Sequence, residues 1–231
     1  MFAGPDPPYP PNFMTPPIHL PSILGIGAGG HCKVVMEIIR RTGSWQIAGL
    51  LDSDTSQNGK SVSGIAILGD DDLASDLFKK GIHAAFIGIG SVGSVQPRRN
   101  ASAFLRNLGF ELPVLIHPSA SVAFDTHIGG GTCIMPGAIV NPGANIGACA
   151  IINSGAIIEH DCQISNFAHI SPGAVLAGSV FVGEGTHIGI GAVVRQGIRL
   201  GKNAMVGAGA VVIKDVPDDT TVTGVPATAR S

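Results

Sequence analysis

The sequence predicts a small α/β domain of Rossmann-like type followed by a left-handed parallel β-helix. The strongest observation is that every sixth residue from Ile116 to Val212 is Ile, Val or Leu, at seventeen consecutive positions without an insertion. The fourth residue after each of these is small or compact, as at Ala138 and Ala144. An α-helix needs apolar spacing near 3.6 and a strand needs spacing of two, so a period of six indicates a hexapeptide solenoid.

Three hexads are expected to close one triangular coil of eighteen residues, because each hexad supplies one short strand and one tight turn. The turn position three residues after each aliphatic residue is usually Gly, Asn or Asp, which tolerate positive φ. Phe167 is the conspicuous departure. Seventeen hexads make somewhat under six coils, and each coil covers the aliphatic residues of its neighbour.

Before the solenoid, apolar strands alternate with helical patterns, which predicts a parallel α/β sheet that binds ligands at the carboxyl ends of its strands. The expected strands are 22–27, 46–51 and 84–89, and the expected helices are 30–41 and about 95–108, leading into 113–116. Residues 1–21 hold eight of the sixteen prolines and are expected to form a disordered extension or to reflect an upstream start. The α/β domain then covers residues 22–112 and the β-helix covers residues 113–231.

A glycine-rich loop joins the first expected strand to the first helix. Gly25, Gly27 and Gly30 satisfy G-x-G-x-x-G, and Asp52 follows at about the separation of a ribose-binding acid, which is the NAD-binding pattern. Only about ninety residues precede the solenoid, so the second mononucleotide-binding half is missing. A phosphate or nucleotide site is better supported, because glycines permit close backbone approach and a helix N-terminus attracts anions. The alternative is a tight turn without a ligand; His31 could cap the helix or contact a bound group.

The composition excludes several classes of function. The net charge is −2 and only 13% of the residues are charged, with no Lys/Arg cluster, so nucleic-acid binding is not expected. No apolar run approaches the ~20 residues of a membrane span. The four cysteines share no CxxC spacing, so neither a disulfide framework nor a zinc knuckle follows. Reduced thiols in a cytoplasmic protein are the simplest interpretation.

Outward polar residues in the middle of the solenoid are the candidates for chemistry. His160 and Asp161 fall in one corner turn, Asn153 falls in the preceding corner, and His169 and His187 stack on one face. Consecutive corners lie a whole side of the triangle apart, on the order of 15 Å. We therefore expect a homotrimer in which His160 of one subunit faces Asn153 and His169 of the next. The alternative is that the histidines are solvated surface residues, which is the favoured interpretation for His187.

The sequence resembles the hexapeptide-repeat sugar acyltransferases related to the sialic-acid O-acetyltransferase and to the bacillosamine and perosamine N-acetyltransferases. The similarity covers about residues 22 to 230 and is specific through its combined motifs rather than through any one hexad. These motifs are the 27–31 loop, Leu51-Asp52, Ile89-Gly90, Ile116-His117-Pro118-Ser119-Ala120, Ile152-Asn153, Ile158-Glu159-His160-Asp161-Cys162, His169, Ala177-Gly178 and Gly224-Val225-Pro226-Ala227.

This resemblance implies transfer of an acetyl group from acetyl-CoA to the amino group of a nucleotide-linked sugar of the 4-amino-4,6-dideoxy type. His160 matches the family's general base, and Asp161 matches the neighbouring acid. A neutral imidazole can take a proton from the attacking amine while a carboxylate fixes its tautomer. The amine then attacks the thioester directly, without a covalent acyl-enzyme and without a metal ion.

The same resemblance implies two sets of binding residues. The acetyl-CoA set, in which His169 could donate to the oxyanion, contains His169, Gly178, Ile190 and Ala208. The nucleotide-sugar set contains Gly29, Gly30, His31, Asp52, Ser53, Gly90 and Asn153. Relatives often carry a second acid where this chain has Ser53, which leaves that contact and the base recognised open.

Three other functions remain open from the sequence. O-acetylation of a sugar such as a sialic acid would use the same two domains. A non-catalytic nucleotide-binding trimer would keep the fold without the reaction. A zinc enzyme of the carbonic-anhydrase type would need three converging histidines, but His160, His169 and His187 occupy two different registers of the coil.

Overall fold

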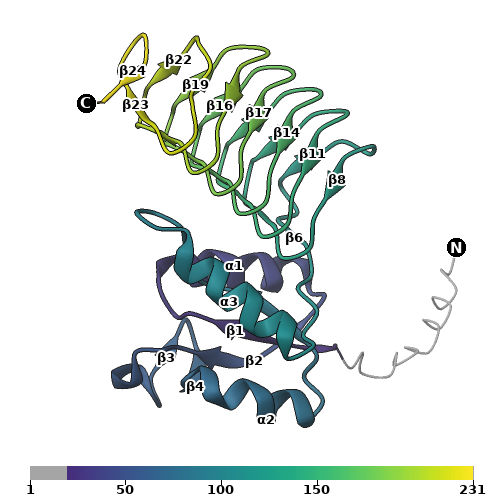
Figure 1. Cartoon of the computed structure of the whole chain (residues 1–231). Coiled ribbons are helices and arrows are strands. Elements are labelled where there is room, and N and C mark those ends of the chain that lie inside the picture. The colour runs from purple at the N-terminus through teal and green to yellow at the C-terminus, as the bar shows by residue number, and fades with distance from the viewer. Residues whose placement is uncertain (1–19, 231) are drawn as a thin grey trace, which may run out of the picture.

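The computed structural model describes residues 20–230 and contains a five-stranded α/β sheet joined to a three-sided β-helix (Figure 1). The predicted disordered extension lies outside the described residues, apart from its last two positions. No helix within residues 20–230 is long and apolar enough to cross a membrane.

The N-terminal sheet has the strand order β3-β4-β2-β1-β5, so the chain leaves β1 toward β2 on one side and returns to β5 on the other. This reversal beside β1 is the place where open α/β sheets bind ligands. The strands are β1 (Ser22–Ile26), β2 (Gln46–Leu51), β3 (Ser61–Val62), β4 (Ile65–Gly69) and β5 (Ala84–Ile87). The helices are α1 (Gly30–Thr42), α2 (Ala74–Lys79) and α3 (Gln96–Asn107), with short 3₁₀ turns η1 (Thr55–Gln57) and η2 (Asp71–Leu73).

The prediction for this sheet is confirmed in its main elements and incomplete in its middle. β2 has the expected bounds, and α1 and α3 agree within one residue of the expected ends, whereas β5 ends at Ile87 rather than Ile89. The segment between β2 and β5, for which no element was predicted, adds β4 parallel to β2 and β3 antiparallel to β4. These strands are only two and five residues long, too short for a clear alternating pattern.

The second part of the chain forms the predicted coils of eighteen residues, as the pairing of Ile139 with Ile157 illustrates. Its three faces are called the docked face, which packs on the N-terminal domain, and the apolar and polar faces, which are named after their outward side chains. The docked face contains β6 (Leu115–Ile116), β9 (Cys133–Ile134), β12 (Ile151–Ile152), β15 (His169–Ile170), β18 (His187–Ile188), β21 (Met205–Val206), β23 (Thr221–Thr223) and β24 (Thr228–Ala229). The apolar face contains β7 (Ser121–Val122), β10 (Ile139–Val140), β13 (Ile157–Ile158), β16 (Val175–Leu176), β19 (Val193–Val194) and β22 (Val211–Val212). The polar face contains β8 (His127–Ile128), β11 (Asn145–Ile146), β14 (Gln163–Ile164), β17 (Phe181–Val182) and β20 (Arg199–Leu200).

The interior of the β-helix is the column of aliphatic and small residues that the six-residue period predicts, and nearly all of these side chains are fully buried. The turn positions take positive φ, as at Asp161 with φ 60° and Asn203 with φ 51°. Phe167 adopts the same conformation with φ 59°, so the coil geometry overrides the preference of this residue. The repeat therefore fixes the backbone even where the turn residue is unfavourable.

The outward side chains differ from face to face. On the apolar face they are Ile139, Ile157, Val175, Val193 and Val211 above a single serine, and Ile139 and Val193 are exposed. On the polar face they include His127, Asn145, Gln163 and Arg199. The lower part of the docked face lies against the N-terminal sheet and its helices (Figure 1), where Cys133 and Ile151 pack with Val35 of α1. Two faces of the β-helix are thus uncovered in one chain, and one of these is apolar.

Arg98 of α3 joins the two parts of the chain. Its side chain has no exposed surface and donates four hydrogen bonds to carbonyl oxygens. Two of these bonds go to Ile87 and Ile89 at the carboxyl end of β5, and two go to Cys149 and Gly131 in β-helix turns. A buried guanidinium must be well supplied with acceptors, because an unpaired buried charge is costly. Arg98 therefore fixes the carboxyl end of β5 against the docked side of the β-helix.

Candidate functional site

The glycine-rich loop lies at the carboxyl end of β1 and leads directly into α1. Gly27 has φ 89°, and its amide donates to the Leu51 carbonyl of β2. The cap residue of α1, Gly29, makes no side-chain capping bond, and the space around a Cβ at Gly29 or Gly30 is open. The start of α1 is therefore open to an approaching group at both glycines, and an open helix N-terminus is the arrangement that binds phosphate groups.

Asp52, at the end of β2, supports this loop with its carboxylate. Oδ2 accepts from the amide of Ala28 at 2.7 Å, and Oδ1 accepts from the amide of Asp54 at 2.9 Å. Ser53 beside it is exposed. Asp52 thus lies next to the glycine-rich loop, as the NAD-like spacing predicts, but both of its oxygens already hold backbone amides.

His31, in the first turn of α1, lies at the boundary with the β-helix. Its Nε2 is buried without a hydrogen-bond partner, and it does not cap the helix. Burial lowers its pKa to about 3, with smaller contributions from the charges of Arg98 and His169. A Cβ on Gly90, which follows β5, would lie 3.7 Å from the His31 Cβ. Loop, helix and strand end therefore converge at one point on the docked face.

His169 of β15 lies at that point and is only 5% exposed. Its Nδ1 is 3.0 Å from the hydroxyl of Ser91, and its Nε2 is 3.1 Å from the side-chain amide of Asn153. Burial lowers its pKa to about 3, helped by His187 and Arg98. The alternative of a solvated His169 is therefore wrong, because the loop after β5 covers it. Donation from His169 to an oxyanion requires one of the two ring contacts to be exchanged when substrates bind.

His187 stacks above His169 with 4.6 Å between ring centroids. Its Nε2 is 3.0 Å from the Ser171 hydroxyl, whereas its Nδ1 is buried without a partner. Burial lowers the pKa of His187, and the Ser91 carbonyl opposes this shift. The interpretation of His187 as a solvated residue is wrong, because the ring is half-buried in the wall of a cavity.

This cavity, of about 410 Å³, opens above the covered part of the docked face. The two histidines, Asn153 and Ser171 supply polar groups, and most of the remaining wall is apolar. Ile190 and Ala208, eighteen residues apart, line it as the sequence predicts for stacked corner positions. Four of the predicted binding residues thus share one cavity: Asn153, His169, Ile190 and Ala208.

His160 and Asp161 lie elsewhere, on the edge between the apolar and polar faces. His160 Nδ1 is 2.8 Å from Asp161 Oδ2, and the two side chains are 53% and 64% exposed. Asp161 occupies the turn position with φ 60°. Gly178 stacks over the ring, and a Cβ there would lie 2.5 Å from His160 Nε2. The pair can act as a carboxylate-oriented imidazole with an accessible Nε2.

The predicted residues therefore form two groups on different edges of one chain. His160, Asp161 and Gly178 occupy the edge between the apolar and polar faces, whereas the cavity opens along the docked face and its border with the apolar face. Among residues 20–230, no three His, Cys, Asp or Glu side chains come together as a metal site would require.

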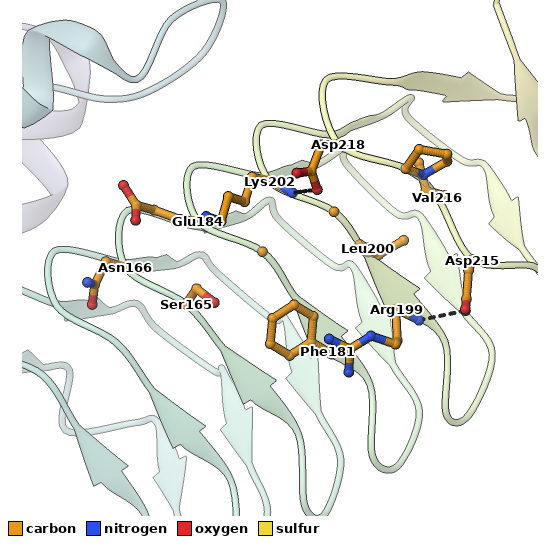
Figure 2. Close-up of a pocket in the computed structure, with 13 residues that line it drawn as sticks. Ser165, Asn166, Phe181, Glu184, Arg199, Leu200, Lys202, Asp215, Val216 and Asp218 are labelled. Carbon is orange, nitrogen blue, oxygen red and sulfur yellow. Dashed lines mark hydrogen bonds between the residues drawn. The ribbon is translucent and has the colours of Figure 1, made fainter.

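A second cavity, of about 710 Å³, lies on the polar face near the C-terminal end of the coils (Figure 2). Figure 2 shows the Arg199 guanidinium beside the Phe181 ring, 4.2 Å from its centroid. Lys202, Asp215 and Asp218 place charges of both signs around it. None of the residues predicted from the sequence lines this cavity, and its mixed charges select no ligand class.

Sequence reasoning missed Ser91, Ser171 and Arg98. Ser91 directly follows Gly90 at the end of a predicted strand, which is the position where an α/β sheet presents polar groups. Arg98 shares the helical spacing of the buried Ala101 and Leu105, so an arginine in an apolar stripe was its signal. Ser171 carried no signal of its own.

Both parts of the chain match known protein families. The model of the PglD N-terminal domain matches residues 22–101, and the model of the bacterial transferase hexapeptide (six repeats) matches residues 179–214. No match was found among the curated proteins.

Three solved structures show the similarity over nearly the whole described chain. PerB from Caulobacter crescentus, in complex with CoA and GDP-perosamine, is 37% identical with a TM-score of 0.84, and the match covers 91% of this chain and 97% of that one. The acetyltransferase domain of PglB from Neisseria gonorrhoeae, in complex with acetyl coenzyme A, is 37% identical with a TM-score of 0.84, covering 91% and 100%. WeeI from Acinetobacter baumannii is 27% identical with a TM-score of 0.75, covering 90% and 100%.

Proposed function

We propose that this chain, which belongs to the hexapeptide-repeat sugar acyltransferases, transfers an acetyl group from acetyl-CoA to the amino group of a nucleotide-linked 4-amino-4,6-dideoxy sugar. The observation that carries this proposal is the similarity to PerB, whose structure holds CoA and GDP-perosamine and which matches both the sheet and the β-helix. We assign the nucleotide sugar to residues 22–112 and acyl transfer to residues 113–231.

His160 is proposed as the general base. The Asp161 carboxylate accepts a hydrogen bond at 2.8 Å, which favours a proton on Nδ1 and leaves the Nε2 lone pair free. Nε2 takes the proton as the amine nitrogen bonds to the thioester carbon, and the imidazolium returns a proton to the leaving CoA sulfur. The C–N bond forms and the C–S bond breaks, so the products are an amide and CoA thiol.

Direct transfer is proposed because the cysteines are poor nucleophiles. All four are buried. Burial raises the pKa of Cys32 to about 12 and raises the pKa of Cys133 and Cys162. Since the thiolate is the reactive form, such thiols do not accept an acyl group readily. A single displacement at His160 needs no such intermediate.

The donor is proposed to lie in the cavity of the docked face. Ile190 and Ala208 offer an apolar track for an extended pantetheine chain, and His169 supplies a polar group at its end. Asn153, which is assigned to the acceptor sugar, lies beside His169 in the same cavity. Gly178 belongs to the opposite wall, because it lies over His160. The nucleotide is proposed to lie at the loop formed by Gly29, Gly30, His31, Asp52, Ser53 and Gly90.

A homotrimer brings these walls together. The valine and isoleucine column of the apolar face, in which Ile139 and Val193 are exposed, is suited to burial against copies of itself. If three apolar faces turn toward a threefold axis, the His160 edge of each subunit meets the Ile190 and Ala208 edge of the next. Three equivalent clefts result, each with a base from one subunit and a donor wall from another.

Release of CoA thiol from acetyl-CoA tests the proposed activity. The assay compares UDP-, GDP- and dTDP-linked 4-amino-4,6-dideoxy sugars with the free amino sugars and with a free sialic acid. We expect thiol release with at least one nucleotide-linked amine and an N-acetyl product in the mass spectrum. Release only with sialic acid would replace the proposal by O-acetylation. Nucleotide binding without any release would indicate a non-catalytic trimer.

A further inference from the structure

The loop between β5 and α3, residues 88–95, connects the proposed nucleotide site to the docked face of the β-helix. Gly90 lies beside His31, and the next residue, Ser91, is buried against His169. Val92 and Ser94 are exposed. Arg98 holds the Ile87 and Ile89 carbonyls at the start of the loop. Beyond these carbonyls, Ser91 is the side chain of the loop that hydrogen-bonds to the β-helix wall.

The direction of each hydrogen bond around His169 follows from Asn153. The Asn153 Oδ1 accepts from the backbone amide of Ser154 at 2.8 Å, so its Nδ2 is the atom that faces His169 Nε2 at 3.1 Å. An amide nitrogen only donates, so Nε2 must accept. Since burial holds the pKa of His169 at about 3, the ring is neutral and its proton lies on Nδ1. Nδ1–H therefore donates to the Ser91 oxygen at 3.0 Å.

This chain of bonds leaves His169 with one tautomer and both nitrogens occupied. The ring is held from the β-helix by Asn153 and holds the loop through Ser91. His187 stacks on the same ring with 4.6 Å between the centroids, so the ring that bonds to Ser91 also forms part of the cavity wall. The loop assigned to the nucleotide sugar and the cavity assigned to acetyl-CoA therefore meet at the hydrogen bond between Ser91 and His169.

We propose that Ser91 is a positioning residue for the acceptor substrate. Ser91 accepts a hydrogen bond from His169, and this bond holds Gly90 of the nucleotide site in a fixed position relative to the acyl-donor cavity. Ser91 does not take part in proton transfer. This inference rests on the proposed function, since it assigns the acceptor to the 88–95 loop and the donor to the cavity.

The kinetic test compares Ser91→Ala with Ser94→Ala, the same change in the same loop at an exposed residue that does not touch His169. For Ser91→Ala, we expect the KM of the nucleotide sugar to rise about tenfold, the size of one lost hydrogen bond. The KM of acetyl-CoA should change less than about twofold, because every residue that lines the cavity except Val92 belongs to the β-helix. Ser94→Ala should leave both KM values near wild type. Equal effects of Ser91→Ala on both substrates, or no effect, would overturn the proposal.

A second measurement does not depend on acetyl transfer. Long-range ¹H–¹⁵N spectra of the histidine rings should show His169 with a proton on Nδ1 in the wild type and in Ser94→Ala. Addition of GDP or UDP should shift these signals in both proteins and leave them unchanged in Ser91→Ala. A wild-type His169 protonated on Nε2 contradicts the assignment. If no nucleotide-linked amine is acetylated but the ring signals respond to GDP or UDP through Ser91, the proposed function fails and the coupling stands.

Discussion

Two histidine sites of this chain differ in almost every physical respect. His169 is 5% exposed, has partners at both ring nitrogens and lies between the two parts of one chain. His160 is 53% exposed, has Asp161 as its partner and lies on an open edge. The first site is complete within one chain, whereas the second has only one wall. Burial within one chain thus leaves the His169 ring with both nitrogens bonded, whereas the exposed His160 ring is the one that a neighbouring subunit is proposed to complete.

The electrostatics follow the same division. At the domain junction, burial and the Arg98 charge favour neutral rings, and the pKa values of His31 and His169 fall to about 3. At the open edge, a carboxylate lies beside an accessible imidazole. A proton acceptor needs a free lone pair within reach of substrate. His160 offers one and His169 does not.

Replacing His160 with Ala is the strongest way to test this contrast. We expect turnover to fall by about 10²–10⁴-fold, the usual cost of removing a general base. The melting temperature should change little, because the exposed side chain bonds only to Asp161. Initial rates of thiol release and a thermal melt measure both. A rate within about twofold of wild type would remove His160 from the mechanism.

Mixed trimers show whether the open edge is completed by a neighbour. His160→Ala subunits are refolded together with Ala208→Trp subunits, whose donor cavity is blocked. Each variant alone should be inactive. The mixture should recover activity, because a cleft that takes His160 from one subunit and Ala208 from the other is intact. Absence of recovery in a confirmed mixed trimer would place both walls in one chain.

The fold could be predicted from the sequence because its signal is repeated. The six-residue period from Ile116 to Val212 averages over seventeen hexads, so single departures such as Phe167 do not obscure it. The β3–β4 hairpin has no such redundancy, since two strands of two and five residues carry little periodic information. Repetition, rather than hydrophobicity alone, made the second part predictable.

The two groups of candidate site residues also differed in how far the sequence could predict them. His160, Asp161 and Gly178 share one edge because eighteen-residue stacking follows directly from the repeat. The burial of His169 could not be foreseen, because it depends on Ser91 from a loop 78 positions earlier in the chain. Contacts between the two parts of the molecule have no periodic signature, so the apolar stripe of α3 indicates that Arg98 is buried but not which β-helix carbonyls it bonds.

Replacing Arg98 with Met tests the structural character of the junction. Methionine fills similar space but leaves four carbonyls without their donor. We expect the free energy of unfolding to fall by about 3 kcal/mol, because the four unsatisfied carbonyls cost about 1–3 kcal/mol each, while removal of the buried charge offsets part of this loss. Arg99→Met is the matched control. Arg99 is 26% exposed and forms an ion pair with Glu184 at 3.1 Å, a hydrogen bond with Asn203 at 3.3 Å and a contact with the Phe167 ring, and such partly solvated interactions are worth about 1 kcal/mol or less each. Equal losses in urea unfolding would contradict the role of Arg98.

The smallest expected effect is the pH dependence that the buried histidines impose on stability. The pKa of His169 is 6.5 in the unfolded chain and about 3 in the folded one. Between these values, only the unfolded state binds the proton. Protonation of His169 therefore does not reduce the free energy of unfolding above pH 6.5. As the pH falls from 6.5 toward 3, the free energy of unfolding declines by up to about 1.4 kcal/mol per pH unit. His31 adds a second proton with the same sign, and Arg98 and His187 are the charged and titratable neighbours of His169.

His169→Gln keeps hydrogen-bonding groups at this position and removes the titration. Urea unfolding at pH 7 and pH 5 should show that wild type loses up to about 2 kcal/mol more than the variant over this interval. Carboxylates that titrate in both proteins cancel in this comparison. Equal losses in the two proteins would mean that His169 takes up a proton within the folded junction. The contrast between the buried, neutral His169 and the exposed, proton-accepting His160 would then no longer separate the two sites.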